Sequence, residues 1–321
     1  MATRKIKNTV ILAAVALTAG ADAAPTGADN AILVAEMSIT PLEAQNIERK
    51  VMTGGFGGNA ELVGTSNVKV SITVELAGSG TAGTAPAWGK LMLGCAMAEG
   101  VLASPARVEY TPVSTGLKDL TIYYYDDGVL HKLLSSMGTF TLTAKVGERP
   151  MLKFDFTGVD GTVSVVANAV PNYSTWKLPV AMTKANVVDV TLGAAYAAGA
   201  FTGGAQYPSN GLEINWGNQV DFLANLSTEK VDINDRNVTG SVEYELTAVQ
   251  EVAFMSDVKL NVLRSLAFQI GLTNGNKIIV AAPSVQHKNY KKVDVKGTRY
   301  AGFDLSYLPV NNNDEIRLVC M

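Results

Sequence analysis

Charged residues are scarce in this sequence, and neither sign dominates. Aspartate, glutamate, lysine and arginine make up 17% of the 321 residues and leave a formal net charge of −3, whereas an average soluble domain has about 25% charged residues. A chain without a basic excess lacks the electrostatic footprint of proteins that grip nucleic acid. Together with a mean hydropathy of +0.16, the low charge favours either extensive surface covered by partner subunits or a β-rich protein with few surface charges.

The chain is also poor in the residue types that usually carry chemistry. Its two cysteines, Cys95 and Cys320, form no spacing motif, which predicts free thiols in a reducing compartment. The two histidines, His131 and His287, stand in no metal-ligand spacing. The glycines of Gly54–Gly58 lack the lysine and hydroxyl residue of a phosphate-binding loop. We therefore expect no catalytic, cofactor-binding or metal-binding residue.

No apolar run is long enough to span a bilayer as a helix, but the N-terminus has the pattern of a secretory leader. Basic residues precede the apolar stretch Thr9–Thr18, and small residues follow in Ala21–Pro25. This order is typical of a signal peptide. The alternative interpretation is an apolar N-terminal arm, which we expect to pack on a neighbouring subunit.

Two segments of the chain occur twice. Asn67–Leu76 and Asn237–Leu246 share five of ten residues without a gap. Gly147–Phe156 and Gly297–Leu305 also match, with a shift of one residue. Because the two matches come in the same order along the chain, they indicate an internal duplication. A duplicated domain favours a protein that builds quasi-symmetric rings over one that holds a unique active site.

The pattern predicts an α+β fold that is mainly β. We expect an N-terminal arm (1–30) and two tandem, similar β-barrel or β-sandwich domains (31–170 and 171–321). Each domain should carry one helix, at Pro86–Gly100 in the first and Ser256–Gly271 in the second.

Several strands are expected from alternation of apolar and polar residues. In Asn67–Leu76 the valines, the isoleucine and the leucine fall on one face and the polar residues on the other. The further predicted strands are Lys118–Tyr125, Val129–Leu134, Thr139–Val146, Pro150–Gly158, Val187–Leu192, Arg299–Tyr307 and Glu315–Cys320. The runs Ala77–Ala85 and Gly193–Asn210 are rich in glycine and alanine and predict loops.

Weak motifs of glycine, proline and aromatic residues recur in a characteristic order. They are Ile11–Val34, Pro41-Leu42, Pro86-Ala-Trp-Gly89 with Cys95, Tyr110–Ser114, Thr121–Gly128, Gly147–Gly158, and Gly211–Gly240 with Asn218 and Arg236. In this order they resemble the major tail tube proteins of long-tailed (siphovirus-like) bacteriophages. In that family the N-terminal apolar stretch belongs to the mature protein.

The resemblance implies a non-enzymatic protein that assembles into stacked rings with six tube domains each and forms the channel for DNA ejection. Two tube-like halves per chain then predict a trimer with pseudo-sixfold symmetry. The implied partners are further copies of the chain, the tail terminator, distal tail and tape-measure proteins, and genomic DNA passing without specific binding. The implied location is the virion tail, assembled in the host cytoplasm without membrane insertion, and no cofactor is implied.

The polar faces of the duplicated strands are candidates for the channel wall. The predicted lumen-facing residues are Lys69, Ser71, Thr73, Glu75, Thr239, Ser241, Glu243 and Glu245. Three carboxylates against one lysine would keep DNA from adhering, because phosphate contacts come chiefly from arginine and lysine. The two glycine-rich loops and the N-terminal arm are candidates for joints between rings.

Two alternative functions stay open from the sequence. One is the inner tube of a contractile injection device, which has the closest architecture. The other is a secreted β-rich binding module with a cleaved signal peptide.

Overall fold

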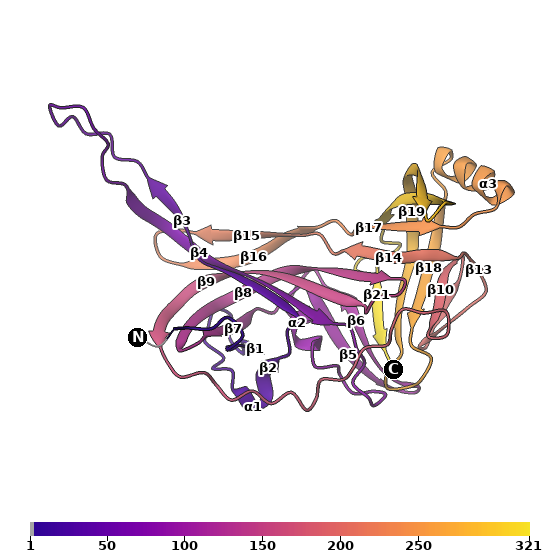
Figure 1. The fold of residues 1–321 in the computed structure, drawn as a ribbon, viewed down its shortest axis with the longest axis horizontal. Coiled ribbons are helices and arrows are strands. Elements are labelled where there is room, and N and C mark those ends of the chain that lie inside the picture. The colour runs from indigo at the N-terminus through magenta and orange to yellow at the C-terminus, as the bar shows by residue number, and fades with distance from the viewer. Residues whose placement is uncertain (1–2) are drawn as a thin grey trace.

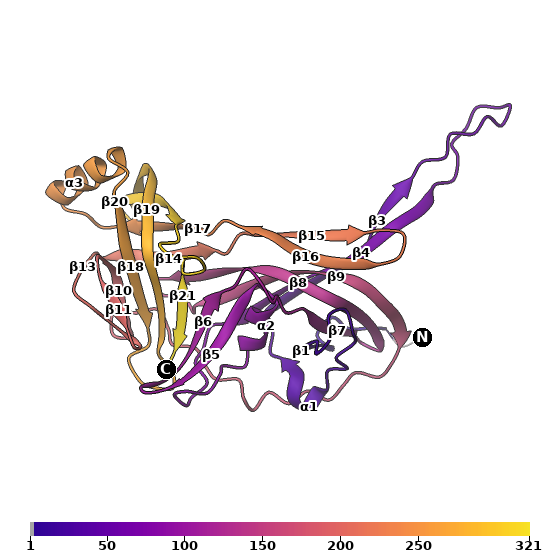
Figure 2. The same cartoon turned by 180° about the vertical axis from the view of Figure 1, so that it is seen from behind.

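Alternating apolar and polar residues form strands along most of the chain. The computed structural model describes residues 3–321. Most strands join one sheet of 17 strands, and two hairpins form separate two-stranded sheets. The molecule is elongated, and the hairpin between β3 and β4 projects from one end while α3 lies at the other (Figures 1 and 2). No helix among the described residues is long and apolar enough to cross a membrane.

The elements of the first half, in chain order, are β1 (Thr9–Val15), α1 (Gly27–Asn30), β2 (Ala31–Ile32), β3 (Glu36–Ile47), β4 (Leu62–Glu75), α2 (Gly89–Leu93), β5 (Met97–Ala103), β6 (Ala106–Pro112), β7 (Leu120–Asp126), β8 (Val129–Lys145) and β9 (Met151–Val165). Those of the second half are β10 (Val187–Leu192), β11 (Ala195–Ala197), β12 (Ala200–Thr202), β13 (Ala205–Gln206), β14 (Ser209–Asn215), β15 (Asn218–Ala224), β16 (Glu229–Arg236), β17 (Thr239–Tyr244), α3 (Ala248–Lys259), β18 (Leu263–Ile270), β19 (Ile278–Val295), β20 (Thr298–Tyr307) and β21 (Arg317–Cys320). The mainly β fold with few helices is confirmed, as an open sheet rather than a closed barrel.

Strand β4 has the two faces that its alternation predicts. Ile72 and Val74 are completely buried, and Phe154 of the neighbouring strand β9 packs in the same core. Burying one such large apolar side chain stabilises the fold by about 1.5–3 kcal/mol. This core therefore fixes which face of β4 stays polar, because a slip of one residue would exchange the two faces.

The duplication seen in the sequence is also present in the strand pairing. Ser71 of β4 lies opposite Asp155 of β9, and Ser241 of β17 lies opposite Asp304 of β20. In each half, the strand from the first matched segment therefore pairs with the strand from the second, and the register is the same in both halves. The order β4, α2, β7, β8, β9 in the first half corresponds to β17, α3, β18, β19, β20 in the second.

The first predicted helix is too long. Only Gly89–Leu93 is helical, and the predicted C-terminal part becomes strand β5, which pairs with β6 along its whole length. Ala96 between them has a φ of 57°, a left-handed conformation that ends the helix. A Cβ at Gly94 would lie 2.7 Å from the side chain of Leu120, so glycine permits the close packing here.

The second predicted helix is displaced along the chain. Helix α3 begins after Thr247, which forms a capping box with Gln250, and ends at Lys259. Half of the predicted segment is instead strand β18, in which Leu266–Ile270 are all buried. A strand buried on both faces gives a continuous apolar run, which periodicity does not distinguish from a buried helix.

The N-terminal stretch is a core strand of its own chain, so the expectation of an arm packing on a neighbouring subunit is wrong for these residues. Strand β1 pairs with β7 from Thr9 opposite Asp126 to Val15 opposite Leu120. Ile11 is completely buried. The apolar pattern that resembles a signal peptide is here the pattern of a buried strand.

Both predicted loops are held against other parts of the chain. In Ala77–Ala85, Gly80 donates its backbone N–H to Gly275 O at 2.8 Å, and a Cβ at Gly78 would lie 2.2 Å from that same oxygen. The run Gly193–Asn210 contains the β11–β12 hairpin, whose aromatic residues pack on a small apolar cluster at the C-terminal strand. It is therefore not a plain loop.

Candidate functional site

The two halves of the chain are joined by strand pairing. Strand β14 of the second half pairs with β8 of the first over five residue pairs, from Gly211 opposite Lys145 to Asn215 opposite Thr141. We call this pairing the internal seam. It makes one continuous run of strands in the order β3, β4, β9, β8, β14, β17, β20 and β19. A second pairing, between β21 and β6, joins the halves elsewhere.

Trp216, directly after β14, anchors the second half in the core of the first. Its side chain is completely buried and stacks on Phe140 with ring centroids 5.2 Å apart. Its indole Nε1 donates to the carbonyl of Cys95 at 2.8 Å, and Asn218 Nδ2 donates to the same oxygen at 3.0 Å. Trp216 is not among the residues predicted from the sequence, although a tryptophan between strands and next to a glycine was a signal for it.

An ion pair and a hydrogen bond from arginine side chains also join the two halves. Glu109 of β6 accepts from Arg107 at 2.6 Å and lies 3.3 Å from Arg317 of β21. Burial raises the pKa of Glu109, but hydrogen bonds from Arg107 and Tyr196 outweigh it, so the net pKa is below its usual value. Arg236 of β16 also contacts the first half, because its Nη1 donates to Val113 O at 3.2 Å while its Nη2 pairs with Glu315 of its own half at 2.8 Å.

The predicted lumen-facing residues lie on one face of the continuous run of strands, which we call the polar face. A line across the sheet from Thr73 passes through Lys153, Thr141 and Asn215 and arrives at Thr239. The neighbouring line leads from Glu75 through β9, β8 and β14 to Ser241. Side chains directly opposite one another share a face. The sheet therefore brings the two copies of the strand together.

The two copies are offset by a stagger of four residues. In the sequence match Thr73 corresponds to Glu243, but across the sheet it is level with Thr239. The same offset holds for Glu75, which corresponds to Glu245 and is level with Ser241. Four strand-to-strand steps separate the copies, so the stagger is one residue for each strand.

Charges on the polar face are more balanced than the sequence suggests. Lys69 lies 2.6 Å from Glu43, and Glu75 accepts from Arg149 at 2.6 Å. Strands β9 and β20 add further carboxylates, and the lysines beside them lie within 3.4 Å of a carboxylate oxygen. Exposed ion pairs of this kind add little stability. Their effect is to leave few unpaired positive charges on this face.

A comparison with protein-family models matches residues 7–306 to the model described as phage tail tube protein. The chain belongs to the phage tail tube protein family. No curated protein matches it. A tail tube protein is a structural component of the virion tail, and the seams and the polar face are therefore the surfaces of interest for assembly.

The polar face of this tail tube protein is partly covered by its own chain. The β15–β16 hairpin of the second half lies over β8 and β9 of the first (Figure 1). Between them is a pocket of about 330 Å³ lined by Lys69, Ser71 and Asp155 from the sheet and by Val220 from the hairpin. Lys69 and Ser71 therefore border a hairpin, whereas Ser241 borders a pocket of about 280 Å³ that no hairpin covers among residues 3–321.

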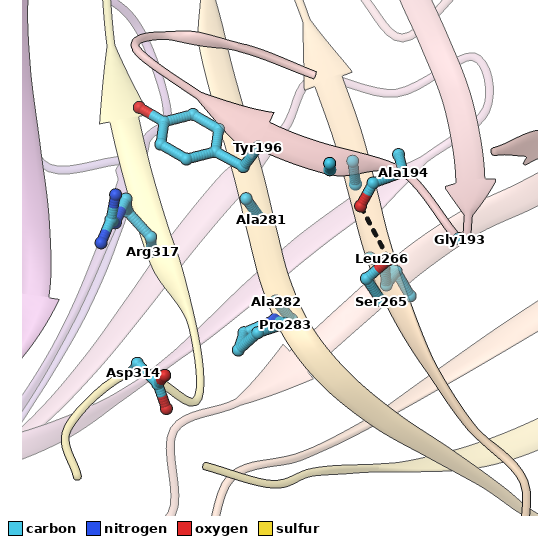
Figure 3. A pocket seen from close by; sticks show the side chains of 12 residues that line it. Gly193, Ala194, Tyr196, Ser265, Leu266, Ala281, Ala282, Pro283, Asp314 and Arg317 are labelled. Carbon is cyan, nitrogen blue, oxygen red and sulfur yellow. Dashed lines mark hydrogen bonds between the residues drawn. The ribbon is translucent and has the colours of Figure 1, made fainter. Parts of the chain in front are cut away.

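A separate pocket of about 450 Å³ lies between β11, β18, β19 and β21 (Figure 3). Its walls are mostly glycine, alanine and proline. Its polar groups are engaged locally: Ser265 donates to Ala194 O at 2.7 Å, and the Arg317 guanidinium lies over the Tyr196 ring at 5.1 Å. This arrangement offers no convergent set of free polar groups to a ligand.

The cysteines and histidines are packing residues of the tail tube fold. Cys95 and Cys320 are free, and burial raises the pKa of both thiols. His287 lies among aromatic rings within hydrogen-bonding distance of Tyr244, and burial lowers its pKa to about 4. Burial also lowers the pKa of His131. Among residues 3–321 no group of three potential metal ligands comes together.

Proposed function

We propose that three copies of this chain close into a ring of six halves, and that the rings stack into the tube through which phage DNA is ejected. The observation that carries the proposal is the internal seam. It already joins two similar halves edge to edge, and the same arrangement repeated between chains generates a closed ring without exposed sheet edges.

The stagger between the halves supports closure. In a barrel the strand number, stagger and tilt are linked. A stagger of one residue per strand gives a ratio of one between the shear number and the strand number. The eight-stranded barrel with a shear number of eight has the same ratio, and its strands tilt by about 36°. Six halves would supply about 24 strands, which at about 4.8 Å spacing and this tilt enclose a backbone diameter of roughly 45 Å. Such a channel is wide enough for a DNA duplex.

We propose that the polar face lines this channel. Lys69, Lys153 and Lys291 on this face lie within 3.4 Å of a carboxylate oxygen, and phosphate binding depends chiefly on free lysine and arginine. DNA would therefore pass without specific binding. In the tail the chain would also contact the tail terminator, distal tail and tape-measure proteins, and its activity would be assembly rather than catalysis.

We further propose that the tail is of the long, non-contractile type and that assembly takes place in the host cytoplasm with the N-terminal strand retained. The burial of Ile11 supports retention, because cleavage near Pro25 would remove β1 from the core of the first half. Mass spectrometry of virion-derived protein tests this point. A mature chain beginning near Ala24 would instead favour the exported binding module.

Native mass spectrometry of rings released from the assembled protein tests the trimer. We expect a species of three times the chain mass of 33.8 kDa. A species of six chains would contradict the proposal. Negative-stain images of the same sample should show annular particles or tubes.

A further inference from the structure

Strand β19 of the second half has a free edge where its counterpart in the first half has a partner. In the first half, β8 pairs with β9 on one side, and on the other side first with β7 and then with β14. In the second half, β19 pairs with β20 on one side and with β18 on the other only as far as Gln286. Within residues 3–321 no strand pairs with Lys291–Val295 on this second side, so β20 is the only strand beside them.

Strand β3 of the first half is the complementary free edge. It corresponds to β14, because Ser38 and Glu213 lie opposite the equivalent serines of β4 and β17. On β14, Leu212 and Ile214 are 1% exposed because β8 covers that edge. On β3, the corresponding Met37 and Ile39 are only half-buried, and β3 pairs with β4 alone among the described strands.

The charges of the two free edges are complementary. Strand β3 contains two glutamates, Glu36 and Glu43, and no basic residue. The free part of β19 with the turn after it contains Lys288, Lys291, Lys292 and Lys296, and one aspartate. Two of these lysines also have exposed carboxylate partners within the chain, Lys291 with Asp304 at 3.1 Å and Lys292 with Glu251 at 3.4 Å. Opposite charges favour pairing of β3 with β19 and disfavour pairing of either edge with its own copy.

We infer that β3 of a second copy of this chain adds to β19 in the register of the internal seam. In this pairing β3 of the second copy takes the place of β14, and β19 takes the place of β8. The residues then opposite one another are Thr40 and Lys291, Ser38 and Val293, and Glu36 and Val295. The pairing rests on the proposed ring and specifies its contact between chains. Three such contacts alternate with three internal seams around the ring.

The same pairing would bring the projecting β3–β4 hairpin of the second copy over the polar face of the second half. In the chain itself the β15–β16 hairpin continues from the internal seam and lies over the polar face of the first half. The β3–β4 hairpin of the second copy would continue from β3 in the same way. It would then cover the pocket beside Ser241 and Asp304 on the second half.

Paired cysteines test the register. In antiparallel strands, opposite residues have Cα atoms about 4.5–5.5 Å apart, within the range that a disulfide bridges. A chain carrying Ser38→Cys and Val293→Cys is assembled under reducing conditions, confirmed as rings by negative stain, oxidised and run on a non-reducing denaturing gel. We expect most of the protein as covalent dimer and trimer, the trimer being the largest product. The native cysteines are buried and stay in place.

Three controls accompany this variant. Each single cysteine variant should stay monomeric on the gel, and Ser38→Cys with Val295→Cys, shifted by two residues, should give at least tenfold less product. Thr143→Cys with Glu213→Cys should close within one chain. Thr40→Cys with Lys291→Cys is a second opposite pair, for use if the first variant does not assemble.

The outcomes separate the inference from the proposed function. Rings that cross-link only in the shifted pair, or through Ser38→Cys alone, would overturn the register, as would failure of both opposite pairs in a protein whose wild type forms rings. Absence of any ring or tube from the wild-type protein would instead contradict the proposed function.

Discussion

Replacing Trp216 with alanine should destabilise the folded chain by about 3–5 kcal/mol, the usual cost of removing a large aromatic residue from a well-packed core. The indole is completely buried against Phe140, and the planes of the indole and the Phe140 ring lie at 18° to each other. The carbonyl of Cys95 keeps a second donor in Asn218, so the lost hydrogen bond adds little to the cost of the cavity.

Urea unfolding of the unassembled chain at low protein concentration measures this loss. Trp216→Phe keeps an aromatic ring against Phe140 and should lose only about 1–2 kcal/mol. Trp88→Ala, a change of the same size within the first half alone, provides a comparison. Subunits with Trp216→Ala should also assemble less well than those with Trp88→Ala at equal stability. A loss below about 1 kcal/mol for Trp216→Ala would refute its role as the anchor between the halves.

The remaining predictions concern pH, the N-terminus, the thiols and the channel. His287 has a folded-state pKa of about 4 against an ordinary value of 6.5. Above pH 6.5 the imidazole is neutral in both the folded and the unfolded chain. Between pH 6.5 and 4 the unfolded chain binds a proton there more readily, so the protein should lose about 3 kcal/mol of stability as the pH falls to 4. Urea unfolding across this range should show a weaker pH dependence for His287→Phe, and an unchanged one would contradict this assignment. Ile11→Asp should prevent folding, and a soluble variant with wild-type circular dichroism would argue against the core role of β1. The Cys320 thiol should react with a thiol reagent only after urea is added. Phages with Glu243→Lys and Glu245→Lys should eject DNA more slowly in low salt, and an unchanged rate would count against a channel position for these residues.

Local alternation and the internal match were enough to predict β4, β9, β17 and β20 and their correspondence, but not β3, β14 or β19. The polar and apolar faces of β4 follow from its period of two, and the second match places Asp155 and Asp304 in equivalent positions. The helices were harder. Residues Leu266–Ile270 are buried on both faces, and the pairing of β18 with two neighbours, not local propensity, decides that they form a strand.

The seam could not be predicted from local patterns. Pairing of β14 with β8 depends on tertiary contacts between residues about 70 positions apart in the chain. The balance of charge on the polar face also depends on strand pairing, because Lys153 joins this face only through the pairing of β9 with β4. Trp216 had a local signal in its position beside a glycine, but its partner Cys95 belongs to the other half.

Cryo-electron microscopy of the assembled tube tests the central claim most directly. We expect three chains in each ring, six similar halves around the axis, and Thr73, Ser241 and Glu243 facing the channel. Six chains in each ring, or these side chains on the outer wall, would contradict it.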